Sequence, residues 1–569
     1  MSENIKKRGI GIGIEDFKEI IERGSYLVDK TLMIEEIIKS DAKVTLLTRP
    51  RRFGKTLNQS MIRRFFEDER KEDGTPIDNS RLFDGLAISK CGEEILKHKQ
   101  QYPVISISLK SAKQGDFKMA YKCLADDIYR EFMRHRYILR GDKLLAIEKE
   151  RYENLMNRRA DMNEVAKAFA FLSECLAKYH GKNVFILIDE YDVPLENAYF
   201  EGFYDDMIKF IRSFFESALK TNPYLEKSII TGCLRISKES IFTGLNNLKV
   251  CSLLSNLYCD KFGFTPDEVK EMLAYYALSD KYPIVKKWYD GYRFGNAEIY
   301  NPWSIISYID EARLDNFMAR PYWSNTSSND IVKEMVEDAD DETKKDLETL
   351  MNGGTIEKVV HEDITYGDIH ENMDNLWNFL FFTGYLKNEG ERLEGSNIYL
   401  SMSIPNLEVS GVYETSISRW FEKRLEVTDR SSLIEAFEKG DCEAAAEFIS
   451  EQLEETISYH DSSESYYHGF LAALLSGTKK YRADSNRESG NGRPDLIFKT
   501  KRIRNGRAMI LELKRASSFN EMETKCDEAL QQIEDRKYET GLRNEGYEDI
   551  TKYGICFYKK ECIIKKAEH

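Results

Sequence analysis

Long apolar runs are missing from this sequence of 569 residues. Its longest apolar stretches, near residues 184–188 and 376–386, are far shorter than the ~20 residues that a helix needs to cross a bilayer. The first residues are polar and hold no apolar segment of a secretory signal. This pattern excludes a membrane-spanning helix, and we expect a cytoplasmic protein with no membrane partner.

Glycine, proline and paired cysteines are also scarce. The 33 glycines and 11 prolines exclude collagen-like and low-complexity classes. The ten cysteines are scattered, and none forms a Cys-x-x-Cys pair or has the spacing of a zinc-ligand set. We therefore expect reduced and mostly buried thiols.

What the chain does contain is ample apolar material and an excess of acid. Hydrophobic residues make up 41% of the sequence, which is enough for real cores and excludes wholesale disorder. The length predicts about three to five domains. A formal net charge of −15 argues against a constitutive nucleic-acid coat protein, although a local basic groove is compatible with it.

The rhythm of apolar segments divides the chain into three predicted domains. Up to about residue 280, short β-branched runs alternate with helical patterns, which predicts βαβ units around a parallel sheet. Residues 281–430 lose this rhythm and are expected to be a mostly helical, winged-helix-like connector. Residues 431–569 begin with helices and continue with strands, which predicts a second α/β domain. We place the boundaries of the first domain at residues 8–280.

A phosphate-binding loop is predicted after the first buried strand, residues 44–47. The sequence RPRRFGKT at residues 49–56 follows that strand and precedes a helical pattern, which is the context of a P-loop. Backbone N–H groups from Arg52, Phe53 and Gly54 to the start of the helix would then bind phosphates. Lys55 would reach the β- and γ-phosphates, and the Thr56 hydroxyl would bind Mg²⁺.

The loop departs from the general pattern at its first position. The pattern G-x-x-x-x-G-K-[ST] places a glycine where this chain has Arg49, and a side chain there is expected to restrict the turn. The three arginines of the loop are expected to add positive charge. The alternative is a basic strand-to-helix loop that binds no nucleotide.

Two acids at the end of another buried strand favour the nucleotide site. Asp189 and Glu190 follow the apolar residues 184–188, and acids in such a place are costly unless they have partners or a role. We expect Asp189 to hold the Mg²⁺ shell and Glu190 to polarise the attacking water; an ordinary strand-end turn is the alternative. Arg235, after a third strand, would sense the γ-phosphate or pair with a structural carboxylate.

A second constellation lies near the C-terminal end. Asp495 precedes a predicted strand, and after 16 intervening residues Glu512 and Lys514 stand two apart on the next strand. Residues two apart share one face of a strand, so Glu512 and Lys514 would point into one site that Asp495 faces across an antiparallel pair. Both carboxylates would bind Mg²⁺, and Lys514 would position a water or stabilise developing charge. The alternative is a surface hairpin with a Glu/Lys face.

The surroundings of this pair agree with phosphodiester chemistry. Residues 479–515 hold twelve Lys or Arg and four Asp or Glu, a local net charge of +8 that we expect to form a basic patch around the acids. Upstream, Glu464 is the candidate for a further metal ligand on a helix. Downstream, Gln532 would contact the site or else cap or pack its helix.

With both sites in view, the chain resembles the bacterial AAA-ATPase-like family, and its last part is similar to the PD-(D/E)xK nuclease domain that accompanies this ATPase. The resemblance covers most of the chain and includes the RPRRFGKT form of the loop. It is carried by GIEDF at 13–17, YLVDKT at 26–31, RPRRFGKT at 49–56, IDEYD at 188–192, TGCLRIS at 231–237 and WYDGY at 288–292. A further match, IPNLEV at 404–409, suggests no chemistry. The resemblance implies an α/β fold in which a P-loop NTPase parallel sheet is joined to a restriction-endonuclease-like domain.

The two predicted sites are compatible with three alternative functions. The leading hypothesis is an ATPase that uses Mg²⁺ and whose nucleotide state controls a metal-dependent nuclease acting on DNA, with RNA left open. The second is a nucleotide-gated sensor or switch that binds nucleic acid without cutting it. In a third, the P-loop holds ATP without hydrolysis. The sequence leaves the oligomeric state and the biological role open.

Overall fold

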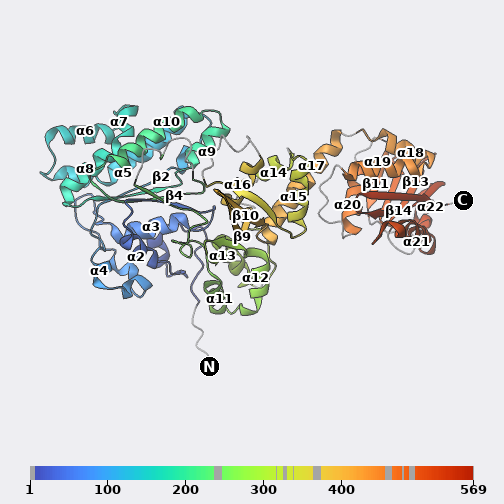
Figure 1. Cartoon of the computed structure of the whole chain (residues 1–569), viewed down its shortest axis with the longest axis horizontal. Helices are drawn as coiled ribbons and strands as arrows, with labels where there is room; N and C mark the ends of the chain where they lie inside the picture. Colours follow the sequence, from blue (N-terminus) through green and yellow to red (C-terminus); the bar gives the residue numbers. More distant parts are fainter. Residues whose placement is uncertain are drawn as a thin grey trace, which may run out of the picture. The chain divides into compact units, whose positions relative to one another are not determined.

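The computed structural model describes residues 7–235, 242, 247–314, 317–323, 330–337, 339–362, 373–427, 429–454, 464–476, 480–485 and 494–567. The chain divides into two compact units (Figure 1). The first contains Met1–Ser328 and Thr355–Gly411, and the second contains Asn329–Gly354 and Val412–His569. Among the described residues, no helix combines the length and the apolar character needed to cross a membrane.

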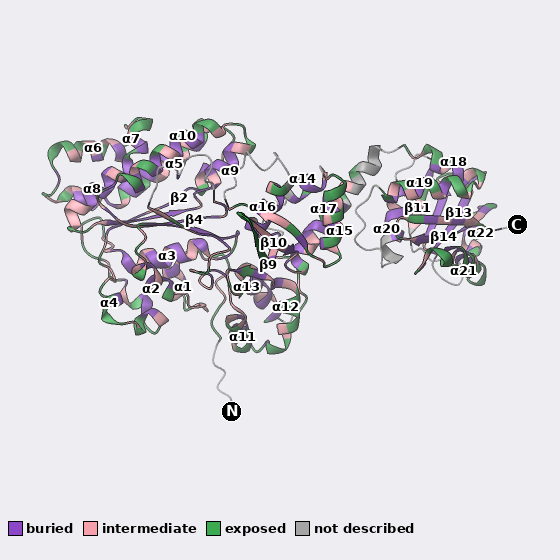
Figure 2. Cartoon of the chain, in the orientation of Figure 1, coloured by how far each residue is buried: buried purple, intermediate pink, exposed green. Residues whose placement is uncertain are grey.

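The first unit is built on a five-stranded parallel sheet with the order β2-β3-β4-β1-β5. Its strands are β1 (Val44–Thr48), β2 (Val104–Ser108), β3 (Val184–Asp189), β4 (Leu225–Gly232) and β5 (Leu248–Cys251). The central strands are buried along their length, as Figure 2 shows in purple, because helices cover both faces. The parallel sheet expected from the alternating segments is confirmed.

Helices cover both faces of this sheet. In Figure 1, α2 (Leu32–Lys39) and α3 (Lys55–Phe66) lie on one face, and α5 (Phe117–Arg134), α8 (Ala168–His180) and α10 (Tyr204–Phe215) lie on the other. The remaining helices of this part are α1 (Phe17–Glu22), α4 (Glu93–Leu96), α6 (Ala146–Met156), α7 (Met162–Ala166) and α9 (Val193–Phe200). The loops that carry the candidate site follow the carboxyl ends of the strands.

Residues 281–430, predicted as a connector, are divided between the two units. The aromatic residues Tyr289, Tyr300 and Tyr308 form a core against which Ile10 and Tyr26 pack, and this core ties the segment to the first unit. The elements from here to the end of that unit are α11 (Pro266–Tyr275), α12 (Tyr282–Tyr289), β6 (Tyr292–Phe294), β7 (Ala297–Ile299), α13 (Pro302–Ala312), β8 (Ile356–Val360), α16 (Met373–Thr383), β9 (Lys387–Glu394) and β10 (Asn397–Ser403). Strands β8, β10 and β9 form an antiparallel sheet.

The second unit contains a mixed sheet with the order β11-β12-β13-β14-β15. Its strands are β11 (Tyr481–Ser485), β12 (Leu496–Thr500), β13 (Arg507–Arg515), β14 (Asp549–Tyr558) and β15 (Glu561–Lys566). Only the pair β13–β14 within these described strands is parallel. The helices are α14 (Asp330–Glu337), α15 (Asp341–Met351), α17 (Leu407–Val427), which begins in the first unit, α18 (Ser431–Lys439), α19 (Cys442–Glu454), α20 (Glu464–Leu475), α21 (Met522–Asp535) and α22 (Glu539–Glu545).

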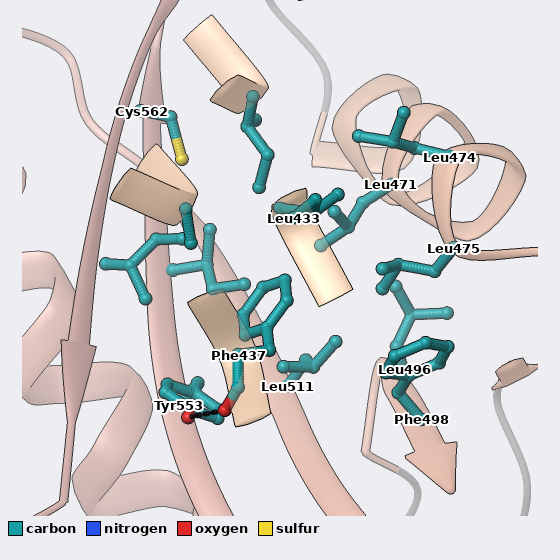
Figure 3. Close-up of a cluster of buried hydrophobic side chains, with 14 of the residues drawn as sticks. Leu433, Phe437, Leu471, Leu474, Leu475, Leu496, Phe498, Leu511, Tyr553 and Cys562 are labelled. Carbon is teal, nitrogen blue, oxygen red and sulfur yellow. Dashed lines mark hydrogen bonds between the residues drawn. The ribbon is translucent and has the colours of Figure 1, made fainter. Parts of the chain in front are cut away.

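Alternating residues of this sheet face two separate cores. Leu496, Phe498 and Leu511 point to the core made with α18, α19 and α20, where the Tyr553 hydroxyl donates a hydrogen bond of 2.7 Å to the Phe437 carbonyl (Figure 3). Ile497 and Ile510 point to the opposite core with α21 and α22. Because side chains alternate along a strand, Asp495, Glu512 and Lys514 belong to this second face.

Candidate functional site

The loop between β1 and α3 has the geometry expected of a phosphate-binding loop. Strand β1 ends at Thr48, and Gly54 caps α3 with a φ of +83°, in the left-handed region that glycine adopts without strain. The first N–H groups of a helix have no partner within the helix, so those at Lys55 and after it point into the loop. The start of α3 is thus a place where an anion binds favourably.

Arg49, at the position where the general pattern has glycine, turns into the core. Its guanidinium donates hydrogen bonds to the carbonyls of Thr48, Cys251 and Ser252 at 2.8–3.0 Å and lies over the rings of Phe262 and Phe294. Burial lowers the pKa of Arg49 to about 10, so the group stays charged at neutral pH. Its φ is not positive, whereas that of Arg52 is +71°. The first loop position therefore does not require glycine in this fold.

The other two arginines of the loop are also held by the protein. Arg51 forms an ion pair with Glu196 on α9, with contacts of 2.7 and 2.5 Å to its two carboxylate oxygens. The Arg52 guanidinium lies 4.5 Å from the centre of the Trp303 ring. The expectation that all three arginines add positive charge to the phosphate site is thus corrected, because Arg49 is buried in the core and Arg51 forms an ion pair with Glu196.

Aromatic side chains from the segment after the sheet support the loop from outside. The Phe53 ring is buried and lies 4.9 Å from that of Tyr292 and 5.1 Å from that of Phe294. The Trp323 indole N–H donates to the Arg51 carbonyl at 3.3 Å. Tyr292 of the WYDGY segment and Trp323 therefore support the loop at residues 49–56.

The acid Glu408 holds this support together. It is buried and accepts hydrogen bonds from the Ser304 hydroxyl at 2.7 Å and from the backbone N–H of Trp323 at 2.6 Å. Burial raises the pKa of Glu408 to about 7. The segment IPNLEV thus has a structural role that its sequence did not indicate.

Lys55 and Thr56, the first two residues of α3, have polar partners at the carboxyl ends of the strands. The Lys55 ammonium is buried and donates to the carbonyls of Arg49 and Pro50 at 2.9 and 3.0 Å. The Thr56 hydroxyl donates to a carboxylate oxygen of Asp189 at 2.7 Å, across the strand β4 that separates β1 from β3. The Thr231 hydroxyl, which sequence reasoning missed, donates to the other oxygen of Asp189. A hydroxyl and a carboxylate in contact are the oxygen ligands that suit Mg²⁺.

Glu190 follows Asp189 in a strained conformation. Its φ of +52° is unusual for a residue other than glycine, and such outliers gather at functional sites. The pKa of Glu190 is raised, first by burial and then by the charge of Asp189. A raised pKa suits a group that takes a proton from water.

Arg235 is found beside an acid. Its guanidinium lies 3.7 Å from a carboxylate oxygen of Glu362, which is the second of the two roles that the sequence left open. Asp192, which sequence reasoning missed, accepts from the N–H groups of Cys233 and Leu234 at 2.7 and 3.1 Å and so shapes the segment that carries Arg235. Contact of Arg235 with a γ-phosphate stays a prediction.

In the second unit the structure brings Asp495, Glu512 and Lys514 together. Pairing of Leu496 with Leu511 sets Asp495 opposite Glu512. The Leu513 N–H donates to Asp495 at 2.8 Å, and the Asp495 N–H donates to Glu512 at 3.3 Å. The Lys514 ammonium lies 3.9 Å from a Glu512 oxygen. The shared face predicted from the spacing is therefore present.

Residues from helices α20 and α21 and from the turn after α21 lie near these acids. The Gln532 amide on α21 donates to Glu512, which decides between the two roles expected of Gln532. His468 on α20 donates to the Asp495 carbonyl at 2.8 Å. The pKa of Tyr538 is raised by burial and by the negative charges of Glu512 and Asp495. Sequence reasoning missed His468 and Tyr538, because neither has a fixed spacing from the acids.

Two neighbouring carboxylates have the oxygen chemistry that suits a divalent cation, although they do not make a complete cluster. Among the described side chains, no group of three or more His, Cys, Asp or Glu is arranged to hold a metal ion. Glu464, the candidate for a further ligand, is the first residue of α20, and its side chain lies outside the described residues.

Three of the basic residues expected around the acids lie away from them in the structure, whereas Arg487 and Arg493 lie outside the described residues. Lys501, Arg502 and Arg504 lie in the loop between β12 and β13, at the end of the hairpin opposite to Asp495. Lys501 lies six positions after Asp495 along extended chain, which is about 20 Å at ~3.3 Å per residue. These three basic residues are thus displaced along the sheet from the acids, because the two strands of the hairpin carry their connecting loop away from its open end.

Comparisons with known proteins agree with the two predicted kinds of domain. Residues 11–242 match the family described as Predicted AAA-ATPase, and residues 462–567 match the PD-(D/E)XK nuclease superfamily. An uncharacterised protein in the vnfD 5′ region of Azotobacter chroococcum mcd 1 is 24% identical over 407 residues, which are 71% of this chain and 69% of that protein. The chain therefore carries one domain that matches the predicted AAA-ATPases, in residues 11–242, and a second domain that matches the PD-(D/E)XK nuclease superfamily, in residues 462–567.

Proposed function

We propose that the protein is a cytoplasmic ATPase whose nucleotide state controls a metal-dependent nuclease domain. The observation that carries this proposal is the convergence of Asp495, Glu512 and Lys514 in a domain of a nuclease superfamily. The contact between Thr56 and Asp189 supports the nucleotide half. ATP and Mg²⁺ are the proposed cofactors and DNA is the proposed substrate.

At the nucleotide site each residue has a separate task. The N–H groups from Arg52 to Thr56 would bind phosphate oxygens, and Lys55 would exchange its two loop carbonyls for the β- and γ-phosphates. Thr56 and Asp189 would hold Mg²⁺, which would supply charge neutralisation on the phosphates. Glu190 would orient the attacking water.

At the nuclease-like site the carboxylates of Asp495 and Glu512 would hold Mg²⁺, which lowers the pKa of a bound water and screens the phosphate. The Leu513 N–H and the Gln532 amide fix the orientations of the two carboxylates through hydrogen bonds. Lys514, beside Glu512, would stabilise the charge that develops on the phosphodiester. These groups suit hydrolysis of a phosphodiester bond.

Cleavage of duplex DNA tests this proposal. The full-length protein is incubated with labelled duplex, ATP and either Mg²⁺ or EDTA, beside the variants Asp495→Ala and Lys514→Ala. We expect Mg²⁺-dependent cleavage that Asp495→Ala abolishes and that Lys514→Ala slows on the order of 10²–10³-fold. Asp527→Ala removes an exposed aspartate that pairs with Lys565 and serves as the matched control. Intact cleavage by Asp495→Ala would refute the assignment of this site.

One observation favours a second function, a nucleotide-gated switch that binds nucleic acid without cutting it. The described residues provide only two carboxylates for a metal, and Lys514 lies close enough to Glu512 to neutralise it. A mobility-shift assay in EDTA separates the two functions. Retention of DNA without metal, together with no product when Mg²⁺ is added, would support the switch.

A further inference from the structure

The second unit presents basic side chains along one edge of its sheet. The edge strand β11 pairs antiparallel with β12, so that its first residue lies beside the β12–β13 loop and its last lies near Asp495. The Lys501 N–H donates to the Lys480 carbonyl at 3.1 Å, which joins the edge strand to the loop. We call the following five residues the basic edge: Lys480, Arg482, Lys501, Arg502 and Arg504.

The loop that carries three of these residues has a defined shape. The Thr500 hydroxyl bridges it, donating to the Arg502 carbonyl at 2.9 Å and accepting from the Arg507 N–H at 3.1 Å. Asn505 has a φ of +54°, and a Cβ at Gly506 would lie 2.5 Å from the Arg502 carbonyl oxygen. The backbone of the loop therefore has a defined shape before any partner arrives, which lowers the cost of ordering the loop on binding.

Charge on the basic edge is only partly balanced by neighbouring acids. Lys480 pairs with Glu438 and Arg482 with Asp484, but both basic side chains are more than half exposed, and exposed pairs contribute little and exchange readily. Within the described part of the chain, Arg502 and Arg504 form no ion pair with an acid. In a protein with a net charge of −15, such a cluster attracts a polyanion locally.

We propose that the basic edge binds the phosphodiester backbone of a nucleic-acid duplex whose scissile phosphate lies at Asp495 and Glu512. This inference rests on the proposed nuclease function for its second contact point. The distance of about 20 Å along the strand corresponds to about six base pairs at ~3.4 Å each. The domain thus holds its substrate at two places, the site of chemistry and a backbone anchor.

Binding in EDTA, measured by fluorescence anisotropy over a salt series, tests the anchor without any cleavage. The triple variant Lys501→Ala, Arg502→Ala, Arg504→Ala should lower the slope of log K against log salt by about 2.7, since each neutralised phosphate contributes about 0.9. The charge-preserving variant Lys501→Arg, Arg502→Lys, Arg504→Lys should keep the slope of the parent. Circular dichroism checks that both variants are folded.

The outcomes separate this inference from the proposed function. Equal slopes for the parent and the alanine triple variant would overturn the anchor even if Mg²⁺-dependent cleavage is intact. Loss of slope in the triple variant, with no cleavage by the parent, would support the anchor and refute the nuclease. Duplexes shortened in steps on one side of the cut should lose affinity when fewer than about six base pairs remain. Equal competition by polyglutamate would identify an acidic protein as the partner and overturn the proposal.

Discussion

The nucleotide loop and the nuclease-like site differ in where their support comes from. Asp495, Glu512 and Lys514 lie on two consecutive strands, and the hydrogen bonds between them follow from the register of that hairpin. The loop at residues 49–56 is instead held by side chains and carbonyls from residues 196–323. A site built on adjacent strands can keep a strict local pattern, whereas a loop supported from elsewhere can depart from its pattern and keep its shape.

The largest effect on activity is expected at Glu190, the acid that follows strand β3. Glu190→Gln should slow phosphate release from ATP on the order of 10²–10⁴-fold, because the amide cannot accept the proton of the attacking water. ATP binding should persist, since Glu190 makes no phosphate contact in the proposed arrangement. A phosphate-release assay beside a binding assay measures both, with Glu201→Gln, near the end of α9, as the control. Equal rates in parent and variant would show that Glu190 is not the catalytic acid.

The departure at the first loop position gives the next largest effect. Arg49→Gly restores the general pattern, yet it leaves the carbonyls of Cys251 and Ser252 buried without their donor. We expect a loss of stability of about 3 kcal/mol and weaker ATP binding. Arg52→Gly is the matched control, because a φ of +71° favours glycine there and the change loses only the contact with Trp303. Chemical denaturation measures both; a neutral Arg49→Gly would contradict the role of Arg49 as an anchor.

Glu408 is expected to make the stability of the first unit depend on pH. Its pKa is raised by burial from an ordinary value of 4.5 to about 7, so the folded state keeps a proton that the unfolded state loses. Its contribution to stability is therefore complete below about pH 4.5, declines as the pH rises to about 7, and is then constant. The total decline is on the order of 3 kcal/mol.

The variant Glu408→Gln should remove this slope. Stability of the first unit, followed by thermal unfolding between pH 4.5 and 8, measures the change in both proteins. Glu391→Gln removes an exposed carboxylate on β9 and controls for net charge. An unchanged pH profile in Glu408→Gln would show that the acid is not protonated in the folded protein near neutral pH.

Local spacing was enough to predict which side chains meet near the C-terminal acids and part of the arrangement around the loop at residues 49–56. The period of two along a strand identified the shared face of Glu512 and Lys514, and the order of strand, loop and helix placed Thr56 near Asp189. The direction of the Arg49 side chain was beyond such reasoning, because its partners at Cys251 and Ser252 lie about 200 residues away. No local pattern signals a contact that only the tertiary fold creates.

The same limit explains the residues that were missed or misplaced. His468 lies on α20, and Tyr538 lies in the turn between α21 and α22 on the opposite side of the sheet. Glu408 has its partners at Ser304 and Trp323, so its sequence neighbours could not show its burial. The basic loop was assigned to the acids by proximity in sequence, yet a hairpin carries its turn away from its open end.

The smallest effect concerns Arg51, which stands two residues from Arg49 in the same loop. Its side chain is 40% exposed, so the pair with Glu196 competes with water, and we expect Arg51→Ala to change stability by less than about 1 kcal/mol. A double-mutant cycle with Glu196→Ala isolates the coupling between the two side chains. A coupling above about 2 kcal/mol would place Arg51 with Arg49 among the anchors of the loop. A small coupling would instead leave Arg51 able to part from Glu196 when phosphate arrives, and the two arginines would then differ in function because they differ in burial.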